Sequence, residues 1–373
     1  MKLKTEENGP LAGIRVVDLS RLLPGPFCTW YLAALGAEVI RIERPQGGDP
    51  TRALPPFRNG ESVFHAYLNR QKASVALDTK DPRGQACLLE LLETADVVVE
   101  SFRPGVMASA GLGPDALLER FPGLVVASIT GYGQDGPLAE EPGHDLNFCG
   151  YAGVIAASGA EEPAPLQMGD YAGALTACVS IIAALFARER SGMGRVLDIS
   201  MTEAALALMG PHLAAVRAEG RNFIPSSEPL TGGLGNYRVY RCRDGKQLCF
   251  APLEPKFWLL FCEKSGFVGS PNHDELAAFF LRDDRDRWVE MLGKTCVTPA
   301  LSAEEIFEEA HFRGRACFEE ILGVEMVRDP FGYAATKSSP ELGADTTRIL
   351  SELAVDLESL YEAGVLFGGP PQP

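Results

Sequence analysis

Apolar runs of strand length alternate with helical spacing of apolar residues over the first third of the chain. Strand-like runs lie at 13–20, 37–45, 74–78, 96–102 and 124–133, and segments of helical spacing lie at 26–35, 84–95 and 112–121. Nearly continuous apolar strands indicate burial on both faces, since a sheet with one wet face shows alternation. This βα repeat predicts an α/β fold in which helices cover both faces of a parallel sheet.

A long apolar segment follows this repeat and begins near Tyr171. The uncharged stretch 171–187 is 17 residues long and contains Gly, Thr, Ser and Cys, so it predicts a buried helix rather than a membrane span. Gly192 and Gly194 end the helix, and 195–200 predicts a strand. Ser200 and Glu203 form a capping-box pattern, which predicts a further helix directly after that strand.

The pattern changes after residue 220. Residues 221–236 are rich in Pro, Ser and Gly, and 236–253 reads as a hairpin that turns at Asp244 and Gly245. Short helices and strands with many charges continue to about residue 325, and 354–365 predicts a last surface helix. We therefore expect a large domain over 1–220, a smaller α/β domain over 221–328, and a C-terminal segment over 329–373.

The composition is typical of a folded protein that is large enough for two domains and lies in a reducing compartment. The chain has 373 residues, of which 46% are hydrophobic, enough for two cores. Its nine cysteines are odd in number and include no CxxC pair, which argues against a zinc site and a disulfide framework. The first ten residues are polar and lack the apolar core of a signal peptide. We expect a cytoplasmic protein without a metal or a membrane anchor.

The net charge is strongly acidic but unevenly distributed. The chain carries −16, which argues against nucleic acid as a partner. Residues 1–72 hold ten Lys or Arg and seven Asp or Glu, a balance of +3, so the remainder carries −19. An anionic ligand would be favoured in the N-terminal part, although ordinary variation of surface charge gives the same count.

Common nucleotide and acyl-transfer motifs are missing from the places where they would carry function. The dinucleotide fingerprint GxGxxG does not follow the first strand, since the turn there, RLLPGPF, has one glycine. The chain also has no Walker motif and no GxSxG. Nicotinamide and flavin chemistry therefore lose their main support.

Basic residues cluster where the predicted strands end, the edge at which open α/β sheets bind ligands. They are Arg41, Arg44, Arg52, Arg70, Lys72 and Arg103. Any one of them is most simply a solvated surface charge. Arg41, Arg44 and Arg103 together favour a phosphate site, because guanidinium groups bind phosphate bidentately.

Three further residues could carry acid–base chemistry. Asp170, in QMGDYAGAL, precedes the long helix and is by default its N-cap, although a carboxylate there could also act as a base or nucleophile. His144 lies in EPGHDLNF, where Asp145 is by default another N-cap, and Glu254 lies in APLEPKFW. The residues alone leave both interpretations open.

The ordered motifs resemble those of family III CoA transferases and α-methylacyl-CoA racemases over nearly the whole chain. They are PLAGIRVVDLSRLLPGPFCTWYLAALGAEVIRIERPQGGDP, NRQKASVALD, ADVVVESFRPGV, TGYGQDGP, PGHDLNF, MGDYAGAL, RSGMGRVLDISM, EPKFW, CVTPAL and GADTTRIL. The resemblance implies a Rossmann-like large domain, a smaller α/β domain, a C-terminal tail that returns to the large domain, and a homodimer of interlinked subunits.

The resemblance also implies coenzyme A as part of an acyl-CoA thioester substrate, with no permanently bound cofactor. The CoA-binding positions that it implies are Arg41, Arg44, Arg70, Lys72, Arg103, Gly131, Tyr132 and Gly133. Asp170 matches the family's reactive aspartate, which raises its catalytic interpretation above that of a cap. In transferases this aspartate attacks the thioester, forms a mixed anhydride with expulsion of CoA thiolate, and passes CoA to a second carboxylic acid.

In racemases the aspartate and a histidine lie on opposite faces of the α-carbon and exchange its proton through an enolate. His144 matches this histidine and Glu254 matches the glutamate that pairs with it, while the backbone N–H of Asp145 could hold the enolate oxygen. PGHDLNF, LEPKFW and CVTPAL resemble the racemases, whereas the long segment 48–78 and the glycines of 231–235 resemble the transferases.

We favour a racemase or epimerase of 2-methyl-branched acyl-CoA thioesters. A family III CoA transferase is the alternative, and a catalytically silent CoA-binding subunit is the third hypothesis. The identity of the acyl group is left open.

Overall fold

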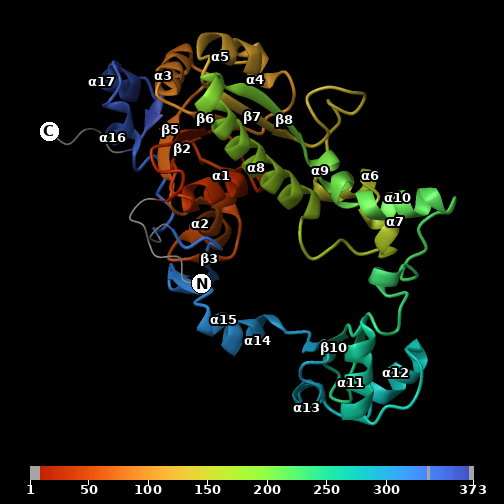
Figure 1. Cartoon of the computed structure of the whole chain (residues 1–373). Helices are drawn as coiled ribbons and strands as arrows, with labels where there is room; N and C mark the ends of the chain where they lie inside the picture. Colours follow the sequence, from red (N-terminus) through yellow and green to blue (C-terminus); the bar gives the residue numbers. More distant parts are fainter. Residues whose placement is uncertain (1–8, 334–336, 369–373) are drawn as a thin grey trace. The chain divides into compact units, whose positions relative to one another are not determined.

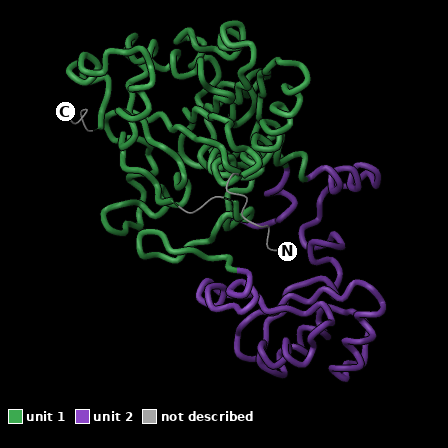
Figure 2. Tube along the Cα trace, turned by 60° about the vertical axis from the view of Figure 1, so that its left-hand side comes forward, with its two compact units in different colours: residues 1–152, 164–208, 316–373 green, residues 153–163, 209–315 purple. Residues whose placement is uncertain are grey.

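The computed structural model describes residues 9–333 and 337–368 (Figure 1). Residues 1–8, on which the expectation of no signal peptide rests, lie outside the described residues. The chain forms two compact units (Figure 2): unit 1 comprises 1–152, 164–208 and 316–373, and unit 2 comprises 153–163 and 209–315. The main boundaries thus lie at 208 and 315, where the sequence suggested 220 and 328.

A seven-stranded sheet forms the centre of unit 1. Its strands are β1 (Arg15–Asp18), β2 (Glu38–Glu43), β5 (Ala73–Leu77), β6 (Val97–Glu100), β7 (Val125–Thr130), β8 (Arg195–Ser200) and β14 (Leu366–Phe367). They lie in the order β14-β5-β2-β1-β6-β7-β8, and all neighbours are parallel except β14 and β5. The six parallel strands follow the doubly wound order, in which the direction of winding reverses between β1 and β6.

Helices cover both faces of this sheet, as the apolar strands predicted. Val16 faces one core and its neighbour Val17 the other, and Val97 and Val98 divide in the same way. The helices of the first face are α1 (Pro24–Ala34) and α8 (Met168–Ser191). Those of the second face are α3 (Pro82–Leu92), α4 (Val106–Ser109), α5 (Pro114–Arg120), α16 (Thr346–Leu350) and α17 (Leu357–Glu362). Burying each such valine stabilises the fold by about 1.5–3 kcal/mol.

The long helix α8 lies in the first of these cores. Ala177 and Ile181 are fully buried in it, and a Cβ at Gly173 would lie 2.6 Å from Met201 Cγ, so glycine allows the next helix, α9 (Met201–Leu208), to approach. Within the described residues α8 is the single helix long and apolar enough to cross a membrane, a property that core helices share. The capping pattern before α9 is present, since the Glu203 N–H donates to Ser200 Oγ at 3.1 Å.

The sequence pattern gave no bounds for several short elements of unit 1, although it suggested a helix start near Asp145 and short elements up to about residue 325. They are η1 (Pro50–Ala53), β3 (Phe57–Arg58), β4 (Glu61–Ser62), α2 (Val63–Asn69), α6 (Asp145–Tyr151), β12 (Phe318–Ile321) and β13 (Val324–Val327). All of them span two to seven residues, too few to show a period.

Unit 2 is built around a three-stranded antiparallel sheet of order β11-β10-β9. Its strands are β9 (Arg238–Arg241), β10 (Gln247–Phe250) and β11 (Val297–Pro299). The predicted hairpin is confirmed, because β9 pairs with β10 across a turn in which Gly245 has φ +79°. The helical elements of unit 2 are α7 (Val154–Ser158), α10 (Gly210–Ala218), η2 (Pro229–Thr231), α11 (Pro255–Ser265), α12 (His273–Phe280), α13 (Arg285–Met291), α14 (Ala303–Glu308) and α15 (Ala310–Gly314). Its core is aromatic, with Phe250, Phe261 and Phe280 in mutual contact.

A network of buried charges lies at the carboxyl end of β1. Asp18 is fully buried and accepts from Arg41 Nη1 at 2.9 Å, Lys72 Nζ at 3.3 Å and Thr29 Oγ1 at 2.6 Å. Arg41 also pairs with Asp49. Burial by itself raises the pKa of Asp18, but Arg41 and Lys72 outweigh it and lower the pKa to about 2. The carboxylate is thus ionised and neutralises cations of β2 and of the segment before β5.

Replacing Asp18 with Asn should lower the free energy of unfolding by about 3–5 kcal/mol, because the buried Lys72 loses its charge partner and the buried Arg41 loses one of its two. Urea denaturation at pH 7 measures the loss. In the natural protein this contribution is present above pH 3.8, the ordinary pKa, and disappears as the pH falls towards 2. Glu38→Gln is the matched control, since its pair with Arg15 is partly exposed and should contribute about 1 kcal/mol or less. Equal effects of the two substitutions would contradict the prediction.

Candidate functional site

A cavity of about 600 Å³ opens where β1, β6 and β7 end. Its wall comes from the loops after these strands and from the starts of two helices. The lining residues used below are Arg21, Phe102, Arg103, Gly131, Tyr132, Glu141, Gly143, His144, Asp145, Phe148 and Asp170, all of them in unit 1. The reversal between β1 and β6 is the place where open α/β sheets hold ligands.

Two glycines fix the start of helix α6 against this cavity. A Cβ at Gly131 would lie 2.4 Å from the Phe148 ring, and one at Gly143 would lie 2.7 Å from it. The Phe148 ring in turn meets Tyr132 edge-on, at 5.2 Å between centroids. Glycine at both positions therefore lets the aromatic ring anchor α6 beside the end of β7.

His144 is the N-cap residue of α6, directly before its first helical residue. It is extended at φ −127°, and its backbone N–H donates to Asn147 Oδ1 at 3.0 Å. Asp145 follows as the first helical residue, so the default N-cap interpretation of Asp145 is wrong. The N–H of Asp145 has no intrahelical acceptor, because it belongs to the first turn.

Asp170 is the third residue of α8, and Gln167 is the N-cap, so its default capping role is also wrong. The Asp170 backbone N–H donates to Asp145 Oδ1 at 3.1 Å. Burial, and next the charge of Asp145, raise the pKa of the Asp170 carboxyl to about 7. A carboxyl that titrates near neutrality can both accept and donate a proton at physiological pH.

Three exposed arginines lie at this edge of the sheet: Arg21, Arg44 and Arg103. Arg103 lines the large cavity, and Arg44 lines a neighbouring hollow of about 20 Å³. Arg21 and Phe102 line both, with the Arg21 guanidinium 5.0 Å from the Phe102 ring centre. Sequence reasoning missed Arg21, although it occupies the loop directly after β1. Together the three guanidinium groups could bind an anion such as phosphate.

The other basic candidates are used inside unit 1. Arg41 and Lys72 are buried in the Asp18 network. Arg70 is fully buried, lies 4.2 Å from the Trp30 ring centre and pairs with Glu319 at 2.9 Å. This geometry favours a structural role for all three, because their charges are neutralised within the protein.

Gly131 and Gly133, which flank Tyr132, belong to the turn after β7. Gly133 has φ +95°, a conformation that favours glycine, and its N–H donates to Thr130 Oγ1 at 3.0 Å. The turn after β7 is thereby fixed, with Gly131 and Tyr132 at the cavity wall.

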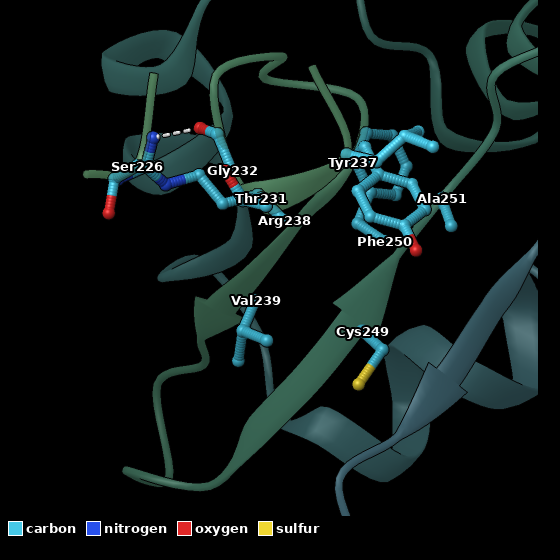
Figure 3. A pocket seen from close by; sticks show the side chains of 10 residues that line it. Ser226, Thr231, Gly232, Tyr237, Arg238, Val239, Cys249, Phe250 and Ala251 are labelled. Carbon is cyan, nitrogen blue, oxygen red and sulfur yellow. Dashed lines mark hydrogen bonds between the residues drawn. The ribbon is translucent and has the colours of Figure 1, made fainter. Parts of the chain in front are cut away.

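Glu254 lies in unit 2 as the residue before α11, so its pairing with His144 stays a prediction. Unit 2 has a cavity of its own, of about 450 Å³ (Figure 3). Its lining is Ser226, Leu230, Thr231, Gly232, Tyr237, Arg238, Val239, Cys249, Phe250 and Ala251. Arg238 Nη1 donates to the Gly232 carbonyl at 2.5 Å, which holds part of the glycine-rich segment 231–235 against β9.

Metal binding has no geometric support in the part of the chain that the structure describes. No group of three or more His, Cys, Asp or Glu side chains there could hold an ion. The cavity instead offers three carboxyls, an imidazole and guanidinium groups.

Comparison with known proteins assigns a family to this arrangement. The model of "CoA-transferase family III" matches residues 11–346. The chain belongs to this family. A CAIB/BAIF family protein from Brucella suis has the same fold, with a TM-score of 0.82, 26% sequence identity and coverage of 92% of this chain and 99% of that chain.

Relatives within CoA-transferase family III carry two different activities. Human alpha-methylacyl-CoA racemase is 33% identical over 94% of this chain and 95% of its own length. Mouse succinyl-CoA:glutarate CoA-transferase is 31% identical over 96% of this chain and 90% of its own length. Family membership therefore indicates an enzyme of acyl-CoA metabolism and leaves both reaction types open.

The raised pKa of Asp170 has a consequence for stability. Ionising this carboxyl is harder in the folded than in the unfolded chain, so the folded state should lose stability as the pH rises from 3.8 to about 7. Asp170→Asn removes this penalty and should stabilise the protein at pH 8 by at most about 4 kcal/mol, with little effect at pH 4. Thermal unfolding at both pH values measures the difference. Asp135→Asn, at an exposed carboxylate of the same unit, is the control. A destabilised Asp170→Asn variant at pH 8 would refute the expected gain.

Proposed function

We propose that this protein is a racemase or epimerase of 2-methyl-branched acyl-CoA thioesters. The observation that carries the proposal is that Asp170 and His144, from two different helix starts, line one cavity. The pKa of Asp170, raised to about 7 by burial and by Asp145, suits reversible proton transfer. Inversion of a carbon centre needs a proton acceptor on one face and a donor on the other, and this pair supplies both.

The reaction would proceed by 1,1-proton transfer. Asp170 or His144 removes the α-proton, and the electrons of that C–H bond form the enolate of the thioester. The other residue then gives a proton to the opposite face, so the substrate is inverted and the two residues exchange protonation states. No oxidant, reductant or second substrate is needed.

Stabilisation of the enolate oxygen is the second requirement, because a thioester α-proton is only weakly acidic. The backbone N–H of Asp145 is our candidate donor, since it lies at the electropositive start of α6 and in the cavity wall. Glu254 would orient the His144 imidazole, as the family resemblance implies. The homodimer is likewise part of this proposal.

The CoA part of the substrate would bind at the cations around the cavity. Arg103, Arg44 and Arg21 surround the edge of the sheet at which the cavity opens. Their guanidinium groups suit the CoA phosphates, in spite of the acidic charge of the whole chain.

Charge reversal of Arg103 tests this placement. Each charge-assisted contact contributes about 1.5–3 kcal/mol, so Arg103→Glu should weaken CoA binding by roughly tenfold to a hundredfold. The loss should be larger at low salt, because ions screen the charge. Calorimetric titration with CoA measures it, and Arg120→Glu, at an exposed arginine of α5, makes the same charge change as a control. Unchanged affinity in Arg103→Glu would remove this residue from the site.

A family III CoA transferase is the second candidate, favoured by the long segment 48–78 and by the 31% identical transferase relative. Here the Asp170 carboxylate would attack the thioester carbon, and CoA thiolate would leave as a mixed anhydride forms. The thiolate would then attack the aspartyl carbonyl and release the first acid, which leaves CoA as a thioester on Asp170. A second carboxylate would take CoA from Asp170 by the same two steps in reverse and free the Asp170 carboxylate. This route uses the ionised form of Asp170, which its burial disfavours near neutral pH.

Heavy water separates the two reactions. With one acyl-CoA and no second acid, the natural protein should place deuterium at the α-carbon and invert it, as followed by proton NMR. His144→Ala should abolish inversion but keep some exchange from one enantiomer, because Asp170 still serves one face. Asp170→Asn should instead abolish exchange from that same enantiomer, because its α-proton faces Asp170, and should keep some exchange from the enantiomer that His144 serves. Full activity of His144→Ala, with an acylated Asp170 trapped by hydroxylamine, would establish the transferase instead.

A further inference from the structure

Helices α6 and α8 approach each other closely at Gly169. A Cβ at this position would lie 3.2 Å from Asp145 Oδ1, 3.3 Å from Phe148 Cβ and 3.5 Å from Cys149 Sγ. The first two distances are shorter than most Cβ contacts in proteins, so glycine permits the first turn of α8 to pack closely on α6. Asp170, the next residue, is thereby brought to the side chain of Asp145.

Asp145 supplies a direct bond between the two helices. Its Oδ1 accepts the Asp170 backbone N–H at 3.1 Å, and its Oδ2 lies 3.7 Å from the thiol of Cys149. Across residues 9–333 and 337–368 Asp145 forms no ion pair, so no bound cation neutralises its charge. A negative charge without a counterion disfavours ionisation of an adjacent, half-buried carboxyl.

Few other titratable groups face Asp170. From α6 they are Asp145, Cys149 and the capping His144, and from α8 itself Tyr171. Helix α1 presents Cys28 and Tyr31 towards α8, α9 carries the exposed Glu203, and Arg103 and Glu141 line the shared cavity. Among all of these, Asp145 is the charged neighbour that raises the pKa of Asp170, after burial.

We propose that the Asp145 carboxylate is a positioning residue for Asp170: it anchors the first turn of α8 through the Asp170 amide, and its charge sets the protonation of the Asp170 side chain. The inference rests on the proposed function, in which the protonation state of Asp170 decides whether it accepts or donates the α-proton. Two carboxyls in unlike surroundings divide into one that stays ionised and one that carries the mobile proton. Asp145 would be the first and Asp170 the second.

Asp145→Asn separates charge from geometry. The amide oxygen can still accept the Asp170 N–H, and the backbone N–H of residue 145 is unchanged, but the negative charge is gone. The acid limb of the pH profile for α-proton exchange in heavy water should therefore move down by about one pH unit. Asp145→Ala also loses the anchor, so its exchange rate at the optimum should fall by about tenfold or more. An acid limb that stays in place in Asp145→Asn would overturn the inference.

Glu141→Gln is the matched control, since it removes another carboxylate from the lining of the same cavity. Glu141 is not among the causes of the raised pKa of Asp170, so the acid limb should keep its position. A shift equal to that of Asp145→Asn would indicate a general effect of cavity charge and would overturn the specific role of Asp145.

A direct titration distinguishes failure of this inference from failure of the proposed function. Carbon-13 NMR of aspartate-labelled protein follows the Asp170 carboxyl, which is assigned by its disappearance in Asp170→Asn. In Asp145→Asn this carboxyl should titrate at lower pH than in the natural protein, whatever reaction the enzyme performs. A shifted titration without any α-proton exchange would refute the racemase and support the control of Asp170 by Asp145. An unshifted titration would overturn that control even if exchange is observed.

Discussion

The buried carboxylate of Asp18 is the interaction on which the site-bearing edge of unit 1 depends. It joins Arg41 of β2, Lys72 before β5 and Thr29 of α1 at the point where β1 ends. The charged groups among them would be costly to bury alone, and their mutual hydrogen bonds and charge pairing offset that cost. The loop that follows, which carries Arg21 into the cavity wall, therefore starts from a fixed position. The edge of the sheet at which the cavity opens is therefore held by buried charges that need not contact a ligand.

The parts of this architecture that follow from local pattern could be predicted from the sequence. Buried strands such as β7 and β8, the long core helix α8 and the turn at Gly245 all have a period or a turn residue that reveals them. The role of Arg41 could not be predicted in this way, because its partner Asp18 lies 23 positions away and only strand order brings them together. A basic residue at the end of a strand suggests a ligand, and the fold instead uses it internally.

For the candidate site as well, local motifs identified the residues, whereas the contacts between them depend on the fold. The motifs around His144 and Asp170 pointed to both residues, and the structure brings both to one cavity. The contact between Asp145 and Asp170 spans 25 positions and depends on the absence of a side chain at Gly169. Neither carboxyl reveals by its local sequence that the other one is near. Their unlike protonation is a property of the packed helices, and only the fold can supply it.

Strand β14 pairs with β5 through only Leu366 and Phe367, and it comes from the last described part of the chain. A growing polypeptide makes β5 early, then the whole of unit 2, and β14 last. During synthesis the edge of the sheet at β5 thus stays open for nearly 300 residues, exposed to strands of neighbouring chains. The short antiparallel strand closes that edge only after the residues of unit 2 have been made. Leu366 and Phe367 thereby protect the edge of β5 from pairing with another chain, and their loss would impair folding yield more than the chemistry of the cavity.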